Sequence, residues 1–404
     1  MASTTPAIDD LFSARAKALE GAALRVGALD RGISFAFGLP DPGSLPREGV
    51  IDATARALRG EGGMWALQYG SARGQTGLLD VLVEKLARDQ RITATPDNLI
   101  VTNGSFHAIE LIAQAFIDPG DTVLIEAPTW SGAVMIYQRA GARTVAVPTD
   151  AAGLDLAALE RTLAELQAQG IRPKFLYTMP TFHNPLGVTM PVERRRRLVA
   201  IAQAHGLPLV EDDAYFDLRF SGAHLPTLYS LDSAGLVIYL STFSKILAAG
   251  MRLGWAVAPA TVAGKLVLLK NDTGSNPFSQ HVAEAFARSG ELRAHIDALI
   301  GIYRRKRDLM LAALEEHMPE GTRWSRPEGG FFIWVTLPPG VDSRALQRRA
   351  LALGVDFLPG TACYGDGRGA GELRLAFSFV AADDIRPGIE RLGRAILDEL
   401  RATA

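Results

Sequence analysis

The chain has 404 residues, of which 48% are hydrophobic and 21% are charged, as in an ordinary soluble globular protein. Its formal net charge of -2 argues against nucleic acid or an anionic membrane surface as the main partner. No apolar run approaches the roughly twenty residues of a membrane span, and the N-terminus lacks the pattern of a signal peptide. The single cysteine, Cys363, excludes an intramolecular disulfide and fits a reducing cytoplasm, where we expect the protein to work.

Short apolar runs alternate with helical periodicity from about residue 98 to residue 260. Strands are predicted at Leu99–Thr102, Thr122–Glu126, Lys174–Thr178, Leu207–Glu211 and Val237–Leu240. Amphipathic helices are predicted between them, for example at 108–116 and at 192–205, the second ending at Gly206. This alternation predicts an α/β domain with a mostly parallel central sheet that helices cover on both faces.

The pattern changes after about residue 288. Here we predict helices at Leu292–His317, near Ser343–Leu353 and from Ala382, with strands at Phe331–Thr336 and Glu372–Phe379. Helices grouped with few strands indicate a smaller α+β domain. We therefore predict an N-terminal segment (1–50) that joins this small domain or a neighbouring subunit, a large domain (51–288) and the small domain (289–404).

Two groups of ionisable residues are interpreted as structural. The basic cluster Arg194–Arg197 is expected on the solvent face of the helix at 192–205. His183 is expected to be structural, and the seven histidines show no metal-ligand spacing, so no metal site is predicted.

Lys245 is the most informative residue in the chain. It follows a predicted strand and the hydroxylated Thr242 and Ser244, and Arg252 lies seven positions further on. A strand that stops here presents the amine beyond its C-terminal end, where open α/β sheets bind ligands. A lysine buried near other cations can lose its proton and attack an aldehyde, while the hydroxyls and Arg252 suit a phosphate. An aldehyde that carries a phosphate suggests pyridoxal 5′-phosphate (PLP).

Three other strand ends carry groups that this cofactor needs. The strand at Leu99–Thr102 runs into Asn103-Gly104-Ser105 and then a helix, which gives free N–H groups for an anion. Asp212 can pair with a protonated pyridine nitrogen, although a helix N-cap is the alternative for an isolated aspartate. Tyr215 could bond the phenolate oxygen of the ring, and Asn184, in a sharp turn, could donate to a ring oxygen and a substrate carboxylate.

Two further residues have an open interpretation from the sequence alone. Trp130 is a candidate flat support for the ring, although most tryptophans are core residues. Arg374 alternates with Leu373 and Leu375, so it faces away from them, toward either solvent or a cleft. In a cleft its planar guanidinium would clamp an α-carboxylate.

These motifs, and their order along the chain, resemble those of the class I/II aminotransferases of PLP fold type I. The chain looks most similar to the branch of 2-aminoadipate and broad-specificity aromatic aminotransferases. The resemblance covers nearly the whole chain, through Gly38-Leu-Pro-Asp-Pro42, Tyr69-Gly70, Asn103-Gly104-Ser105, His183-Asn-Pro-Leu-Gly187, Glu211-Asp-Asp-Ala-Tyr215, Ser241-Thr-Phe-Ser-Lys245 and Arg374. It implies amino-group transfer from an amino acid to a 2-oxo acid, expected to be 2-oxoglutarate, in a homodimer with shared active sites.

The resemblance also implies roles for individual residues. Lys245 forms the internal aldimine and shuttles a proton, Asp212 pairs with the pyridine nitrogen, and Tyr215 contacts the phenolate oxygen. The other cofactor-binding residues are Gly104, Ser105, Phe106, Trp130, Asn184, Thr242, Ser244, Arg252 and Tyr69, with Tyr69 reaching the phosphate of the neighbouring subunit. The substrate is held by Arg374, Asn184 and Gly38.

The chain departs from the family pattern at three positions. Leu186 replaces the threonine of the usual HNPTG turn, Phe106 replaces a glutamine that would bind phosphate, and Ala249 replaces a common proline. None of these changes removes a group that transamination needs. Two alternatives remain: a PLP-dependent oxidase, decarboxylase or lyase that uses the same site, and a regulator that senses PLP or an amino acid. We expect no regulator, because fewer than forty residues precede Gly38, too few for a DNA-binding domain.

Overall fold

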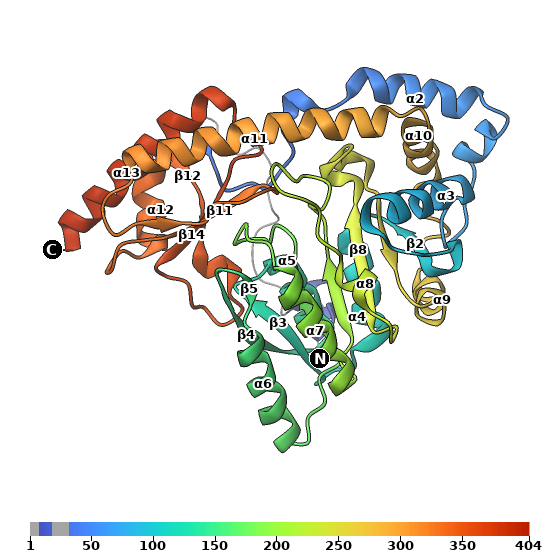
Figure 1. The fold of residues 1–404 in the computed structure, drawn as a ribbon, viewed down its shortest axis with the longest axis horizontal. Coiled ribbons are helices and arrows are strands. Elements are labelled where there is room, and N and C mark those ends of the chain that lie inside the picture. Colours follow the sequence, from blue (N-terminus) through green and yellow to red (C-terminus); the bar gives the residue numbers. More distant parts are fainter. Residues whose placement is uncertain (1–7, 18–31, 404) are drawn as a thin grey trace, which may run out of the picture.

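The computed structural model describes residues 8–17 and 32–403. Its centre is an eight-stranded sheet with the order β2-β9-β8-β7-β6-β3-β4-β5 (Figure 1). The strands are β2 (Leu99–Thr102), β3 (Thr122–Ala127), β4 (Arg143–Asp150), β5 (Gly153–Leu154), β6 (Leu176–Thr178), β7 (Leu209–Asp212), β8 (Val237–Thr242) and β9 (Gly254–Val257). The neighbours from β8 to β4 are parallel, whereas β9 runs antiparallel to β8 and β2, and β5 runs antiparallel to β4. The sheet is therefore mostly parallel, as predicted.

Helices cover both faces of this sheet because its strands are apolar on both faces. In β3, Val123 and Ile125 pack into one core cluster and Leu124 packs into another. The first cluster contains residues of α4 (Ser105–Phe116), α5 (Ser131–Arg139) and α9 (Ala260–Leu269). The second contains residues of α6 (Leu156–Ala168), α7 (Val192–His205) and α8 (Leu228–Leu231). Strands buried on both faces read as continuous apolar runs, which explains why their positions could be predicted.

A smaller group of elements follows in sequence. Its antiparallel sheet has the order β10-β11-β14-β13. The strands are β10 (Arg323–Trp324), β11 (Phe332–Thr336), β13 (Leu358–Pro359) and β14 (Glu372–Ala376), and the helices are α11 (Glu291–His317), α12 (Ser343–Ala352) and α13 (Ala382–Thr403). Near the N-terminus, β1 (Ile33–Ser34) pairs in parallel with β12 (Val355–Asp356). This part of the N-terminal segment therefore joins the C-terminal elements, while the domain boundaries at 50 and 288 remain a prediction.

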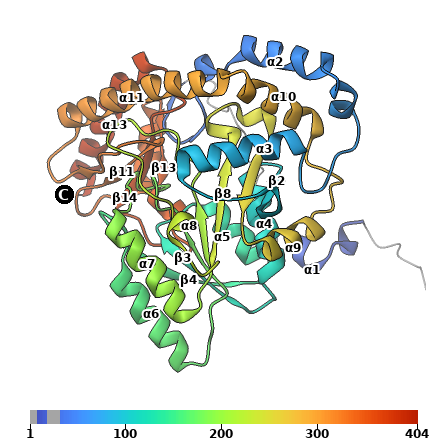
Figure 2. The same ribbon diagram turned by 45° about the vertical axis from the view of Figure 1, so that its right-hand side comes forward.

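The long helix α11 connects the two parts of the molecule. Figures 1 and 2 both show it running from α10 (Pro277–Arg288) to the helices α12 and α13. Next to this end of α11, helix α10 packs against α2 (Arg47–Arg59), the 3₁₀ segment η3 (Gly63–Leu67) and α3 (Thr76–Lys85). The remaining short elements are η1 (Ile8–Leu11), α1 (Ala14–Lys17), η2 (Pro42–Ser44), η4 (Leu86–Gln90), η5 (Pro96–Asn98), η6 (Phe243–Lys245), η7 (Ala249–Met251) and η8 (Gly360–Cys363).

The basic cluster Arg194–Arg197 corrects one prediction. Arg196 and Arg197 are exposed on α7, as expected, but Arg195 is completely buried. Its guanidinium donates to the carbonyl oxygens of Met190, Pro180 and Pro226 and to the Thr181 hydroxyl. A buried guanidinium is tolerated when its donors are satisfied in this way, and charge clustering in the sequence does not reveal such partners.

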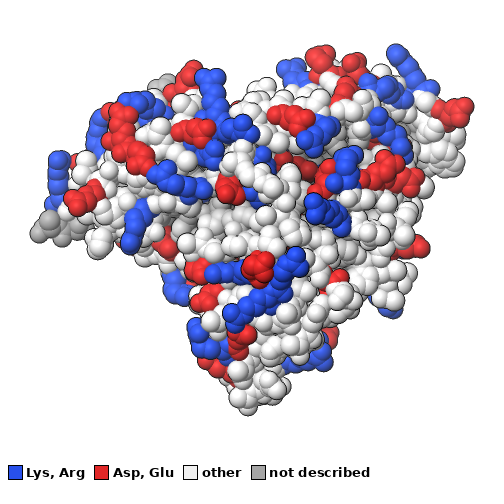
Figure 3. All heavy atoms as spheres, in the orientation of Figure 1, with Lys and Arg blue, Asp and Glu red and all other residues white. Residues whose placement is uncertain are grey.

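Positive and negative side chains are interspersed on the face shown in Figure 3, in keeping with the small net charge. Among the helices of residues 8–17 and 32–403, none is long and apolar enough to cross a membrane.

Candidate active site

A pocket of about 290 Å³ lies where β7 and β8 end, beside the start of α4. It collects every predicted site residue except Tyr69: Gly38, Gly104, Ser105, Phe106, Trp130, Asn184, Asp212, Tyr215, Thr242, Ser244, Lys245, Arg252 and Arg374. The walls also include residues that sequence reasoning missed: Met179, Thr181, Phe182, Ala214 and Phe332. A larger cavity of about 1030 Å³, beside Leu186 and Trp334, contains none of the predicted site residues.

Lys245 ends the short turn η6 that follows β8. The Thr242 hydroxyl starts this turn by accepting from the Ser244 amide at 3.1 Å. The Lys245 side chain is half-buried, and its Nζ donates to the Gly38 carbonyl oxygen at 3.0 Å. Burial lowers the pKa of Lys245 to about 8, and the positive charges of Arg374 and Arg252 act in the same direction. A substantial share of this amine is therefore neutral and nucleophilic in weakly alkaline solution.

Asp212 is the last residue of β7 and presents one open oxygen. Its Oδ2 accepts from the Tyr177 hydroxyl at 2.6 Å, whereas its Oδ1 is buried and has no hydrogen-bond partner among the described residues. Burial raises the pKa of Asp212 to about 6. A buried acceptor without a partner is costly, so a cationic N–H donor such as a protonated pyridine nitrogen fits this position. Asp213, in contrast, does not line the pocket.

The turn before α4 forms a cradle of the kind that binds phosphate. Gly104 precedes the helix with a φ of 79°, and a Cβ at this position would lie 2.6 Å from Arg252 Nη2. Glycine adopts this positive φ without strain, and the Arg252 guanidinium lies close beside the turn. Free N–H groups at the start of α4 and the nearby Ser105 and Ser244 hydroxyls complete a site suited to a dianion.

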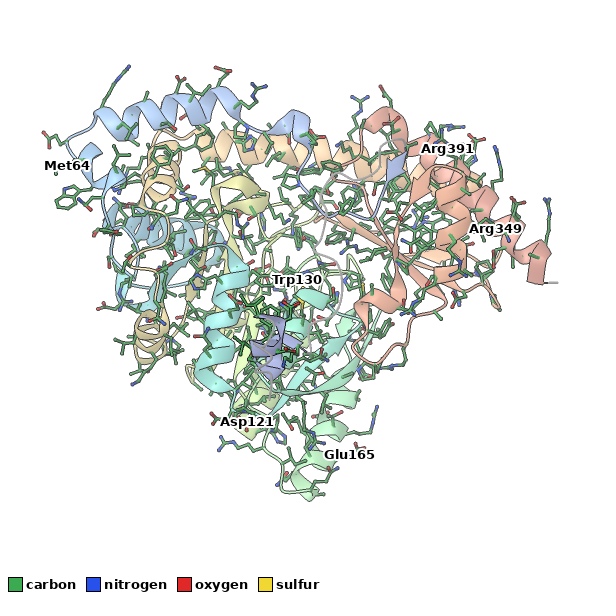
Figure 4. All side chains as sticks on the ribbon, turned by 180° about the vertical axis from the view of Figure 1, so that it is seen from behind. Met64, Asp121, Trp130, Glu165, Arg349 and Arg391 are labelled. Carbon is green, nitrogen blue, oxygen red and sulfur yellow. The ribbon has the colours of Figure 1, made fainter. Side chains whose placement is uncertain are left out.

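Trp130 is the half-buried residue before α5, and it lies near the middle of the view in Figure 4. The Phe106 ring meets it edge-on, with the ring centroids 5.8 Å apart and the planes at 79°. Both rings line the pocket, so Phe106 contributes an apolar wall where the family pattern has a glutamine. On another wall, the Tyr215 ring packs edge-on against Phe331 and Phe332.

Arg374 lies in the pocket, which decides between the two orientations left open by the sequence. Its Nη1 donates to Asn184 Oδ1 at 2.8 Å, and its Nη2 donates to the Ala36 carbonyl oxygen at 2.7 Å. The guanidinium lies 4.2 Å from the centroid of the Phe332 ring. Its Nε is buried without a hydrogen-bond partner in the described part of the chain. This fixed, partly unsatisfied guanidinium suits a carboxylate ligand.

Three other predicted residues lie outside this chain's pocket or serve its structure. His183 is buried, and its Nε2 lies 2.9 Å from Glu126 Oε2, which agrees with a structural role. Cys363 is buried beside Leu186 and Trp334. Tyr69 is 81% exposed and does not line the pocket of its own chain.

Comparison with known proteins places the chain in a family. The sequence profile of "Aminotransferase class I and II" matches residues 37–392. The chain is 40% identical to aromatic-amino-acid aminotransferase 1 of Thermococcus litoralis over 371 residues, which cover 91% of this chain and 89% of that protein.

Two solved structures extend this likeness to the fold. Kynurenine aminotransferase of Pyrococcus horikoshii, determined with PMP, is 40% identical with a TM-score of 0.93, covering 97% of this chain and 98% of that one. Alpha-aminoadipate aminotransferase of Thermus thermophilus, complexed with N-(5'-phosphopyridoxyl)-L-leucine, is 36% identical with a TM-score of 0.90, covering 98% and 100%. The chain therefore belongs to the class I and II aminotransferases, as a PLP-dependent enzyme of the aminoadipate and aromatic branch.

Proposed function

We propose that this pocket transfers the amino group of an amino acid to 2-oxoglutarate, with Lys245 as the lysine that binds the aldehyde of PLP. The observation that carries the proposal is the set of three complementary groups in one pocket. These are the Lys245 amine with its lowered pKa, the open Oδ1 of Asp212 and the cradle at Gly104. The free, buried Cys363 is in keeping with the cytoplasm as the proposed compartment.

Each group has a defined task toward the cofactor. When bound, PLP supplies an aldehyde that condenses with amines and a pyridine ring that accepts electrons from the substrate carbon. Asp212 Oδ1 would hold the proton on the pyridine nitrogen, and the Gly104 cradle with Arg252 would neutralise the phosphate. The Lys245 amine, which lies in the same pocket, would move the proton at the substrate Cα.

The Arg374 guanidinium would hold the substrate. Both the amino acid and the 2-oxo acid carry an α-carboxylate, so the same clamp by Arg374 and Asn184 serves both half-reactions. Phe332 and Asn184 fix the plane of the guanidinium before the ligand arrives, which reduces the ordering cost of binding. The choice of 2-oxoglutarate as acceptor rests on the likeness to aminoadipate and aromatic aminotransferases.

The half-reaction tests this proposal directly. One equivalent of amino donor should convert the absorbance of the lysine-bound cofactor into that of pyridoxamine phosphate, and 2-oxoglutarate should then restore it. Release of carbon dioxide, ammonia or hydrogen peroxide, with no pyridoxamine phosphate formed, would instead indicate a decarboxylase, lyase or oxidase. A panel of amino donors in the same assay identifies the preferred substrate.

The lowered pKa of Lys245 predicts how the apoenzyme captures PLP. Only the neutral amine attacks an aldehyde, so the rate should rise with pH and level off above about 8, the pKa of this side chain. Stopped-flow measurement of the developing cofactor absorbance between pH 6 and pH 10, estimated to bracket this titration, gives the profile. A rate that still climbs steeply near pH 10, as for an ordinary lysine, would contradict the assignment.

Tyr69 supports a homodimer with shared sites. It follows the exposed apolar residues Met64, Trp65 and Leu67, a surface suited to a second copy of the chain. Figure 4 shows Met64 at the edge of the view, well apart from Trp130 near the middle. We propose that Tyr69 donates to the phosphate bound by the neighbouring subunit.

Mixed dimers test the shared site. A Lys245→Ala chain and a Tyr69→Ala chain, each impaired alone, should form heterodimers in which one site contains both native residues. Mixing them should therefore restore activity, to about half the native value per heterodimer if the two sites are independent. No restoration, although sedimentation shows that heterodimers have formed, would mean that Tyr69 does not act across the interface.

A further inference from the structure

Residues 35–41, called the strap below, run along the pocket and contact two of its key groups. The Ala36 carbonyl oxygen accepts from Arg374 Nη2, and the Gly38 carbonyl oxygen accepts from Lys245 Nζ. Gly38 lies so close to Phe332 that a Cβ atom added to this glycine would be 2.5 Å from Cζ of the Phe332 ring. The strap therefore contacts both the carboxylate clamp and the reactive amine.

One end of the strap is held by backbone pairing. The Phe35 amide donates to the Asp356 carbonyl oxygen at 2.8 Å, and the Phe35 carbonyl oxygen accepts from the Ala376 amide at 2.8 Å. Phe35 itself is completely buried. This end is thus part of the fold and does not depend on side-chain charges.

The other end of the strap is held by Lys306 of α11. The Lys306 ammonium forms an ion pair with the Asp41 carboxylate and donates to the Ser378 carbonyl oxygen at 2.8 Å. The Asp41 amide donates to the Tyr303 hydroxyl at 3.1 Å. The Lys306 side chain is 5% exposed and that of Asp41 is 16% exposed, so little solvent competes for this pair.

Lys306 thereby connects the strap to the segment that contains Arg374, because Ser378 lies four residues after Arg374. A buried ion pair tolerates the loss of one partner badly, since the other charge then remains without compensation. Without Lys306, the strap would keep its Phe35 end, whereas its Asp41 end would lose the ion pair and keep the weaker bond to the Tyr303 hydroxyl. The Ala36 carbonyl, which helps to orient the Arg374 guanidinium, would then be held firmly from the Phe35 side only.

We propose that Lys306, together with Asp41, is a positioning residue that holds the strap so that Arg374 is preset for the substrate carboxylate. This inference rests on the proposed role of the pocket in binding α-carboxylates. Lys306 contacts neither cofactor nor substrate in this account, because its ammonium is bonded to Asp41 and Ser378 and it does not line the pocket.

Three variants test the inference on the PLP-loaded enzyme. Lys306→Met and Asp41→Ala should raise KM for both the amino donor and the 2-oxo acid about tenfold, as expected for the loss of a buried charged hydrogen bond. The kcat and the PLP content should stay within about twofold of the native values, because the reacting groups remain in place. Asp41→Asn keeps an acceptor oxygen and should give a smaller rise in KM than Asp41→Ala.

Lys85→Met is the matched control. Lys85 belongs to a buried pair with Asp217, with side chains 3% and 8% exposed, and Lys85 does not line the pocket. This substitution should lower Tm and leave KM unchanged, which separates loss of stability from loss of positioning. If Lys306→Met fails to fold, Asp41→Ala carries the test, because Asp41 is the more exposed partner.

Hydrogen exchange gives a readout that does not need turnover. In Lys306→Met the Asp41 amide, which keeps only its bond to the Tyr303 hydroxyl, should lose part of its protection, whereas the Phe35 amide, held by Asp356, should keep it. A KM within about twofold of native in folded Lys306→Met and Asp41→Ala would overturn the inference, as would unchanged protection at Asp41. If the native enzyme transfers no amino group, the proposed function is refuted. The hydrogen-exchange result would still show whether Lys306 holds the strap.

Discussion

Replacement of Lys245 by alanine is expected to lower kcat by about four orders of magnitude or more, because a nucleophile and a proton carrier are lost together. The pKa of this pocket amine is lowered to about 8, and among the described residues its hydrogen bond goes to the Gly38 carbonyl oxygen. Steady-state kinetics with the best amino donor gives the measurement. A variant that keeps more than about a tenth of the native kcat would show that another group moves the proton.

Two controls make this result specific. Lys245→Arg keeps the positive charge but cannot deprotonate near neutral pH, so it should be as inactive as Lys245→Ala. Added methylamine can enter the space left by the alanine substitution, so it should restore part of the activity of Lys245→Ala. It should restore no activity to Lys245→Arg, in which the arginine side chain fills this space. Both variants should still unfold cooperatively, which excludes a collapse of the fold as the cause.

Replacement of Asp212 by asparagine is expected to cost about two to four orders of magnitude in kcat, the range for loss of a positioned proton-transfer partner. Its Oδ1 is the open acceptor of the pocket, and a neutral amide would not stabilise a protonated pyridine nitrogen. Stopped-flow conversion of the cofactor with amino donor should slow in parallel. The Tyr177 hydroxyl can still donate to the remaining amide oxygen, so the pocket should keep its shape.

Asp213→Asn is the matched control for this variant. Asp213 is equally buried but lies outside the pocket, and burial raises the pKa of its carboxyl well above the usual range. Replacing it should change stability and leave kcat within about tenfold of native. A reversed pattern, with Asp212→Asn active and Asp213→Asn inactive, would assign the pyridine contact to Asp213.

The parts of the fold that could be predicted were those with strong local patterns. The strands β2, β3, β6, β7 and β8 are fully buried apolar runs, and each was predicted to within two residues at its ends. The strands β4, β5 and β9 of the large sheet were missed, as were the short strands β1, β10, β12 and β13. Seven of the eight residues of β4 are partly buried or exposed, so its apolar signal is weak, and β9 begins with a glycine, a residue that strands disfavour.

The candidate site shows the same division between local and long-range information. Lys245, Asp212 and Gly104 could be predicted because each follows a strand that the sequence itself reveals. Tyr177 was missed, because its bond to Asp212 depends on the register between β6 and β7. The pair of Asp41 and Lys306 joins residues 265 positions apart, and only the packing of α11 against the strap brings them together.

Borohydride reduction of the PLP-loaded enzyme, followed by peptide mapping, tests the central assignment most directly, because it fixes the cofactor to the lysine that holds it. The chain offers Lys17, Lys85, Lys174, Lys245, Lys265, Lys270 and Lys306. Lys270 is the strongest competitor, because it is buried and ion-paired with Asp272, which in turn bonds Asn103 beside the cradle. We expect the pyridoxyl group on Lys245 and on no other lysine. A label on Lys270, or on any lysine outside the pocket, would contradict the account.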